Sequence, residues 1–282
     1  MTVRLLCAGL STVDLLYRVD RIPGADEKAQ AGSVTVAAGG PALNAAVTAA
    51  ALGADVTLLT AVGTHPLGEL IRDDLHRHGV TLIDAAPDTA TPPPVSAVTV
   101  DPTGRRTVVS RNAGDVAVRV PPDLDLAVAA VLVDGHHPAL AVAAARAARL
   151  LIVDAGTWRP VFAEILPLAD VVACSAGFRP PGATGDDEIA AAILAAGTRH
   201  VAITHGPDPV RWWSGGRSGE IPVPPVEAVD TAGAGDAFHG ALAVALTRDP
   251  EINDLRSALA YAVHVAGVRV RHWGPRDWLS RV

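Results

Sequence analysis

The segment from Asp230 to Leu242, DTAGAGDAFHGAL, sets three glycines and two carboxylates at the start of a run with helical composition. Glycines allow the main chain to approach a ligand closely, and the free N–H groups of a first helical turn attract anions. Gly233, Ala234 and Gly235 take that position if the helix starts at Gly235 or Asp236. The segment therefore predicts an anion-binding turn.

Two common anion motifs do not fit this turn. A dinucleotide fingerprint needs a glycine where Phe238 stands, and a Walker loop needs a lysine after its last glycine. A carboxylate inside the turn would repel a phosphate, unless it accepts a hydroxyl proton from a second substrate while the N–H groups stabilise a transferring phosphoryl group. The alternative interpretation is that Asp236 only favours the helix N-terminus electrostatically.

A second group of polar residues lies near the N-terminus. In GGPALN, Gly39 and Gly40 allow close approach of the main chain, and Asn44 supplies both a donor and an acceptor. Asp14 follows the first predicted strand. Short carboxylate and carboxamide side chains suit the adjacent hydroxyls of a sugar, although a glycine turn before a core helix and a polar strand end would give the same pattern.

Apolar runs and alanine-rich stretches alternate along the chain and position these residues. The predicted strands cover 3–10, 55–63, 129–136, 149–156, 170–175 and 200–206, and the predicted helices cover 40–54, 66–79, 139–149, 186–197, 235–247, 253–271 and 275–281. This alternation predicts an α/β fold around a mostly parallel sheet. Ligands bind beyond the carboxyl ends of such strands, where Asp14, Ser175 and Thr204 fall.

Residues 15–38 and 95–111 break this alternation, because they have the period of half-exposed strands. The second segment contains a turn at Asp101 to Gly104. Pattern alone leaves two interpretations open, a small sheet standing off the main domain or edge strands of the main sheet. Four valines in these segments, at positions 34, 36, 98 and 100, are expected to be exposed and suggest dimerisation through this small sheet.

Composition narrows the classes of partner. The chain has 282 residues and a formal net charge of −7, and its scattered basic residues give no surface for nucleic acid or an anionic membrane. Two cysteines are too few for a disulfide framework, and no apolar run reaches the length of a membrane span. The N-terminus makes a poor signal peptide, so we expect a cytoplasmic protein with a small-molecule substrate.

The chain resembles the ribokinase-like, or PfkB-type, carbohydrate kinases. DTAGAGDAFHGAL resembles their C-terminal signature, and GGPALNAAVTAAALGADVTLLTAVG at 39–63 resembles their N-terminal signature, in the family's order. The similarity covers nearly the whole chain. It implies a single domain over 1–282, an α/β/α sandwich with a mostly parallel central sheet, a small β-sheet lid from about 15–38 and 95–111, ATP as phosphoryl donor, and a sugar-like alcohol as acceptor.

The resemblance also implies roles for individual residues. Asp236 matches the general base and the turn at 233–235 matches the anion hole. The expected sugar contacts are Asp14, Gly39, Gly40 and Asn44. Nucleotide contacts are expected at Thr204, Gly206 and Ser175, magnesium is expected with ATP, and Asp230 matches a position where some members bind a monovalent cation such as K⁺.

Two positions depart from the family pattern. Many members carry N-x-x-E after the strand at 170–175 to organise magnesium, whereas this chain has Ser175 and Phe178 there. The serine resembles the branch with ketohexokinase and sulfofructose kinase. An Asn often found close to the adenine is Val263 here. Two alternatives to a sugar kinase therefore remain, a nucleoside kinase similar to adenosine kinase and a weakly active or inactive sugar- or nucleotide-binding protein on the same fold.

Overall fold

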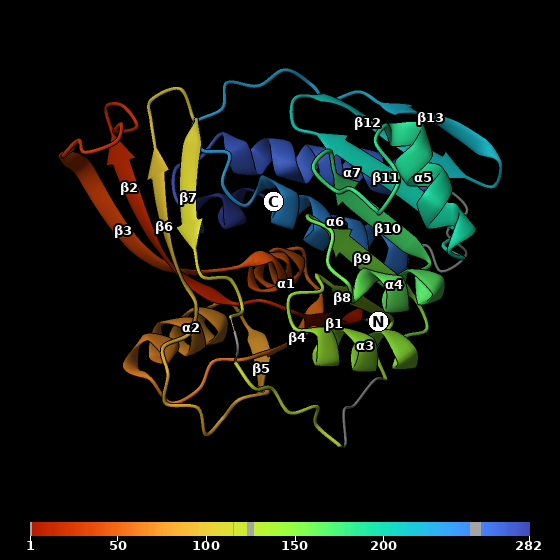
Figure 1. Ribbon diagram of the computed structural model, residues 1–282, viewed down its shortest axis with the longest axis horizontal. Coiled ribbons are helices and arrows are strands. Elements are labelled where there is room, and N and C mark those ends of the chain that lie inside the picture. Colours follow the sequence, from red (N-terminus) through yellow and green to blue (C-terminus); the bar gives the residue numbers. More distant parts are fainter. Residues whose placement is uncertain (1, 115, 123–126, 249–254) are drawn as a thin grey trace.

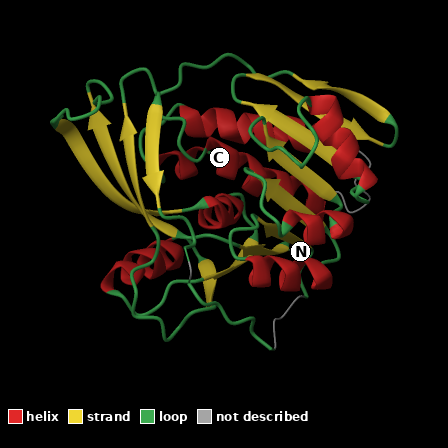
Figure 2. Ribbon diagram, in the orientation of Figure 1, coloured by secondary structure: helices red, strands yellow, loops and turns green. Residues whose placement is uncertain are grey.

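Two sheets organise the chain, and Figure 1 shows the smaller one standing at one end of the larger. The computed structural model describes residues 2–114, 116–122, 127–248 and 255–282. Sheet A has strand order β13-β12-β11-β10-β9-β8-β1-β4-β5, and sheet B has order β3-β2-β6-β7. Helices cover both faces of sheet A, so the fold is the expected α/β/α sandwich with a β-sheet lid (Figure 2).

Sheet A is parallel over seven strands, and two antiparallel strands complete it. The parallel strands are β1 (Arg4–Ala8), β4 (Asp55–Thr60), β5 (Val80–Asp84), β8 (Ala130–Val133), β9 (Leu151–Ala155), β10 (Val171–Ser175) and β11 (His200–His205). The antiparallel strands are β12 (Asp208–Ser214) and β13 (Arg217–Ile221). All six predicted strands are confirmed. The turn between the two antiparallel strands lies at Gly215 and Gly216.

The helices pack on the two faces of sheet A because successive strand residues point to opposite faces. In β1, Leu5 and Cys7 join the core beneath α1 (Pro41–Ala51), α2 (Pro66–Arg77), α6 (Ala234–Arg248) and α7 (Leu255–Val270). Leu6 and Ala8 join the opposite core beneath α3 (Pro138–Ala147), α4 (Phe162–Ile165) and α5 (Asp186–Ala195). Short 3₁₀ helices at Leu166–Leu168 and Asp277–Arg281 complete the helical segments.

Sheet B is formed by residues 12–39 and 95–110, so its first strand begins three residues before the predicted lid segment. Its strands are β2 (Thr12–Val19), β3 (Ala31–Gly39), β6 (Val95–Val100) and β7 (Arg106–Ser110). Hydrogen bonding places Leu16 opposite Val98, and both side chains are buried with Val100 in a small cluster. The expectation that Val98 and Val100 are exposed is therefore wrong, because they lie on the face of the lid that is covered, whereas Val34 and Val36 are exposed as expected.

Cys7 and Cys174 are both buried and free, so neither forms a disulfide. Within the ranges described above, the structure contains no helix that is both long and apolar enough to cross a membrane.

Candidate active site

The glycine-rich turn leads directly into α6, where the sequence placed an anion-binding site. Gly233 adopts a positive φ of 71°, and its carbonyl accepts the Ala237 N–H at 2.9 Å, which closes the first helical turn. Helix α6 begins at Ala234, one residue earlier than expected, and the Ala234 N–H contacts the Thr231 carbonyl at 3.4 Å. Asp236 lies in this first turn, where the helix dipole favours negative charge.

Asn44 joins the two sequence signatures into one site. Its Nδ2 donates to Oδ2 of Asp236 over 2.7 Å, although the two residues are 192 positions apart. The contact follows from the packing of α1 against α6, where Gly240 lies so close to Ala45 that a larger residue would overlap its carbonyl. The bond orients one carboxylate oxygen of Asp236 and leaves the other to accept a proton.

Asp14 and the Gly39–Gly40 pair form the lid side of the site. The Thr12 hydroxyl donates to Asp14 Oδ1 at 2.6 Å, and burial raises the pKa of Asp14, with the nearby Asp236 charge acting in the same direction. A Cβ at position 39 would overlap the Asp14 carboxylate. Gly40 has φ 97° and would place a Cβ 2.6 Å from the Leu10 carbonyl. Gly39 is therefore required for close packing against Asp14, and Gly40 for close packing against the main chain at Leu10.

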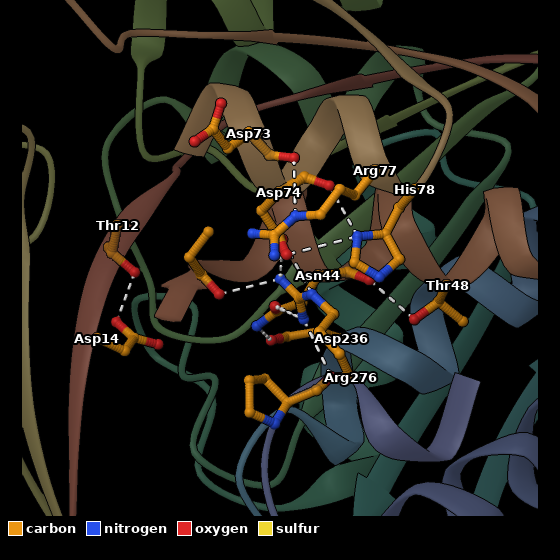
Figure 3. A network of polar contacts seen from close by, with 12 residues as sticks. Thr12, Asp14, Asn44, Thr48, Asp73, Asp74, Arg77, His78, Asp236 and Arg276 are labelled. Atoms are coloured by element: carbon orange, nitrogen blue, oxygen red, sulfur yellow. Dashed lines mark hydrogen bonds and ion pairs between the residues drawn. The ribbon is translucent and has the colours of Figure 1, made fainter. Parts of the chain in front are cut away.

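A partly buried network from the C-terminal segment holds Asn44 in place (Figure 3). Arg276 Nη1 donates to Asn44 Oδ1 at 3.0 Å, while Nε and Nη2 donate to Asp74 Oδ2 at 3.0 and 2.8 Å. Nη2 also donates to the Ala38 carbonyl at 2.9 Å. Sequence reasoning missed Arg276 and Asp74, because neither belongs to a recognisable local motif.

The expected nucleotide residues lie together at the carboxyl ends of β10 and β11. Ser175 pairs with Thr204 in register, and the Ser175 hydroxyl donates to the Gly156 carbonyl at 2.8 Å. Gly206 follows β11 with φ 64°. Phe178 is fully buried against Trp158 and Phe162, so it belongs to the core. The hydroxyl and the phenyl ring that replace N-x-x-E therefore do not fit a magnesium-organising role.

A buried acid lies between these two groups. Asp154, at the end of β9, is 3.4 Å from Nδ1 of His239 on α6. Burial raises the pKa of Asp154 to about 6; the His239 contact opposes that shift, and the Asp236 charge adds to it. Arg159, one of the charges that act on Asp154, lies with its Nη2 3.0 Å from Nε2 of His136. This edge of sheet A thus carries both acidic and basic groups.

Asp230 lies behind the glycine-rich turn and is fully buried. Its Oδ1 accepts the Ala232 N–H at 2.9 Å, and its Oδ2 accepts Nη2 of Arg269 at 2.9 Å. Arg269, which was not singled out from the sequence, is 3% exposed. A monovalent cation was expected at Asp230, but the carboxylate is already paired with a buried guanidinium.

Two hollows contain residues that the sequence singled out. A small cavity of about 40 Å³ is lined by residues that include Asp14, Asn44, Gly233 and Arg276. A larger one of about 550 Å³ lies between the end of β13 and α7, with Val263 in its wall. The first is the candidate acceptor side, and the second contains the position where the resemblance placed an adenine contact.

The fold and the site define an ATP-dependent sugar kinase with a small β-sheet lid. Residues 3–280 match the family model of the pfkB family carbohydrate kinases, and the chain belongs to this family. It is 33% identical to an ATP-dependent ribose-1-phosphate kinase of Halopiger xanaduensis, over 92% of this chain and 89% of that protein. Identity to the ribokinase of Bacillus subtilis is 29%, over 96% and 94%. A crystal structure of a suggested ribokinase from Agrobacterium tumefaciens superposes with a TM-score of 0.86 at 26% identity, covering 99% of this chain and 94% of the other.

Proposed function

We propose that the protein transfers the γ-phosphoryl group of ATP to a hydroxyl of a ribose-type sugar, with Asp236 as general base. The observation that carries this proposal is the 2.7 Å contact between Asn44 and Asp236 at the N-terminus of α6, beside the partly buried Asp14. It joins a carboxylate, an anion-binding turn and a polar sugar contact in one place. Phosphoryl transfer needs these three elements.

Each residue has a distinct task in the proposed reaction. Asp14 and Asn44 bind hydroxyls of the sugar, and the lid above them excludes water that would otherwise compete as acceptor. The free oxygen of Asp236 takes the hydroxyl proton as the sugar oxygen forms its bond to the γ-phosphorus, and the bond to the β-phosphate oxygen breaks to release ADP. The N–H groups at 233–235 stabilise the negative charge that develops on the transferring group.

Magnesium is expected to arrive with the nucleotide, because Mg²⁺ usually binds phosphate oxygens and water with few protein ligands. The residues at positions 175 and 178 do not fit the family's way of organising it, since the Ser175 hydroxyl already donates to Gly156 and Phe178 is a core residue. Among the residues described, no group of three or more acidic, histidine or cysteine side chains is arranged to hold a metal. No residue is therefore assigned to magnesium.

A ribose that already carries a phosphate is the second candidate acceptor. The ribose-1-phosphate kinase among the relatives supports it, and so does the contact between Arg159 and His136 at the end of β8. Asp236 is one of the charges that act on the pKa of His136, which places this basic pair near the proposed base. A guanidinium there suits a phosphate on the sugar.

A panel of acceptors with ATP and magnesium, read by ADP release, tests the function. The panel contains ribose, ribose 1-phosphate, fructose, 2-keto-3-deoxygluconate and adenosine. We expect release with ribose or ribose 1-phosphate, and the preferred one of the two identifies the acceptor. Highest activity with adenosine would favour the nucleoside kinase, and binding without release on every compound would favour an inactive binding protein.

The Asp236→Asn variant tests the base on the best acceptor. The amide cannot take the proton, so turnover should fall by roughly 10²-fold or more, while the melting temperature stays close to that of the unmodified protein. A loss smaller than about tenfold would contradict the assignment of Asp236. The matched control is Asp73→Asn, which changes an exposed acid on α2 and should leave turnover unchanged.

A further inference from the structure

The strongest departure from the family expectation is a buried cation where a metal ion was expected. Arg269, near the end of α7, is 3% exposed, and Asp230, just before the glycine-rich turn, is 0% exposed. A buried charge is costly unless it is paired and its hydrogen bonds are satisfied. Arg269 meets both conditions, because Nη2 donates to Asp230 Oδ2 at 2.9 Å and Nη1 donates to the His272 carbonyl at 2.9 Å.

This guanidinium lies directly behind the proposed anion hole. A Cβ built on Gly233 would be 3.8 Å from Nε of Arg269 and 3.6 Å from Oδ2 of Asp236. Arg269 also lines the same small cavity as Asn44 and Gly233. The Asp230 carboxylate, held by Arg269 on one oxygen, accepts the Ala232 N–H on the other. The ion pair therefore fixes the main chain immediately before the turn.

A monovalent cation does not fit this site. Such an ion needs several oxygen ligands to replace its water, and carbonyl oxygens are typical donors. Arg269 already donates to three oxygens here, the Asp230 carboxylate, the Asp230 carbonyl and the His272 carbonyl, at 2.9, 3.4 and 2.9 Å. An alkali ion beside them would also face a fixed positive charge at close range.

We propose that Arg269 is a built-in replacement for a monovalent cation, so that phosphoryl transfer by this protein is independent of K⁺. The inference rests on the proposed function. Arg269 acts as a positioning residue: it neutralises Asp230, holds the 230–233 segment, and adds positive potential behind the N–H groups where charge develops. Unlike a bound ion, it cannot dissociate.

The first experiment replaces potassium chloride by tetramethylammonium chloride at constant ionic strength, which keeps screening the same. Turnover on the best acceptor and the melting temperature of the free protein are both measured. We expect neither to change. A saturable rise of either quantity with K⁺ would overturn the proposal. If no acceptor is phosphorylated at all, the proposed function fails, and the melting temperature still decides whether K⁺ binds.

The second experiment uses Arg269→Ala, which removes the guanidinium and leaves space beside Asp230. Without K⁺, turnover should fall by roughly tenfold or more, and K⁺ should restore part of it and raise the melting temperature. A purely structural arginine would not be rescued by an ion. The control is Arg271→Ala, which removes an exposed arginine two residues further on and should show no K⁺ response.

The double variant Asp230→Asn with Arg269→Ala keeps the test decisive if Arg269→Ala does not fold, because it leaves no buried unpaired charge. It should have low turnover that K⁺ does not restore, since the carboxylate that would bind the ion is gone. Turnover close to that of Arg271→Ala in K⁺-free buffer, for either the single or the double variant, would overturn the role of Arg269.

Discussion

The two ends of the candidate site are built in different ways. The acceptor end is defined here as Asp14, Asn44, Asp236 and Arg276. Hydrogen bonds between side chains there join Asn44 to Asp236 and to Arg276, which is 232 positions away. At the nucleotide end, defined as Ser175, Thr204 and Gly206, the contacts run mainly from a side chain to a nearby main-chain carbonyl. The first end is fixed by side-chain chemistry, and the second by the path of the backbone.

This difference teaches where substitutions are tolerated. The acceptor end must hold a base and a hydroxyl in a reactive geometry, and small displacements there are expensive. In the proposed reaction, the nucleotide end binds phosphates through main-chain groups, which do not depend on residue type. Ser175 and Phe178 at the positions of N-x-x-E illustrate this tolerance, because a hydroxyl contact and a core ring have taken the place of polar residues.

After loss of the proposed base itself, the largest effect should come from breaking the acceptor end at Arg276. In Arg276→Met, Asn44 loses its partner at Oδ1 and Asp74 loses both of its contacts from Arg276. The carboxamide can then rotate away from Asp236, so kcat should fall by on the order of a hundredfold, with little change in the KM for ATP. Steady-state kinetics with each substrate varied in turn would measure this.

Arg72→Met is the matched control for Arg276→Met. Arg72 lies on α2 and forms an ion pair with Asp84 at 2.7 Å, so its loss removes a comparable partly buried pair outside the site. We expect similar destabilisation in both variants but a large fall in kcat only for Arg276→Met. Equal kcat values would show that the acceptor end is not held by Arg276, and the contrast between the two ends would weaken.

The next largest effect is on the pH dependence of stability. It concerns Asp154, the acid between the two ends. The pKa of Asp154 is raised by burial from 3.8 to about 6, so the folded protein binds a proton that the unfolded chain releases. Its contribution to stability is present at low pH and is lost as pH rises through about 6. Relative to Asp154→Asn, the unmodified protein should lose roughly 1.4 kcal/mol of unfolding free energy between pH 5 and 8.

Chemical denaturation of both proteins at several pH values measures this difference. The Asp170→Asn variant is the control for losing a carboxylate that pairs with a cation. Asp170, on the loop before β10, forms an ion pair with Arg199. If the gap between the unmodified protein and Asp154→Asn does not change with pH, or widens in favour of the unmodified protein as pH rises, then Asp154 is ionised throughout. Asp154 would in that case carry a fixed negative charge beside Asp236 at every pH tested.

A smaller effect should follow from a change of backbone at the nucleotide end. Gly206 has φ 64°, and a Cβ there meets no atom within 4 Å, so Gly206→Ala adds conformational strain without a clash in the free protein. The expected cost is about 1 kcal/mol of unfolding free energy, together with a severalfold rise in the KM for ATP where the methyl group meets the nucleotide. The KM for the sugar should not change.

Gly79→Ala separates the two causes. Gly79 has φ 68°, also has open space around its Cβ position, and follows α2 away from the site. Both variants should lose similar stability, whereas only Gly206→Ala should raise the KM for ATP. An unchanged KM in Gly206→Ala would mean that the nucleotide does not approach this turn.

The contrast between the two ends also explains what the sequence could predict. The turn at 233–235, Asp236 and Asn44 lie in two local signatures, and helix packing alone brings these signatures together. Arg276 and Arg269 have no local signature. They act through tertiary contacts with Asn44 and Asp230, at separations of 232 and 39 positions, which no periodicity in one sequence reveals.

The lid shows a related limit. Period-two alternation predicts which residues share a face of a strand, but it does not tell which face is covered. Val34 and Val36 were therefore placed correctly on an exposed face, and Val98 and Val100 were not, since they pack beside Leu16. Register decides the matter, because Leu16 is paired with Val98 across β2 and β6.

The smallest effect on catalysis is expected from a substitution on the outer face of the lid. Such a substitution tests whether one chain supplies the complete acceptor end. Strand register places Val36, Leu15, Ala97 and Val109 in one row across sheet B, on the face opposite to Asp14 and Leu16. Val36 is 50% and Val109 70% exposed, so this row is an apolar surface suited to the lid of a second copy.

Val36→Lys should convert a dimer to a monomer in size-exclusion chromatography with light scattering, because a buried lysine in the contact is unfavourable. Turnover per chain should stay within about twofold, since every acceptor residue comes from a single chain. Thr81→Lys, at an exposed position on β5 outside the lid, serves as the control for added charge. A monomeric unmodified protein would refute the dimer, and a large loss of turnover in Val36→Lys alone would mean that the acceptor end depends on the partner.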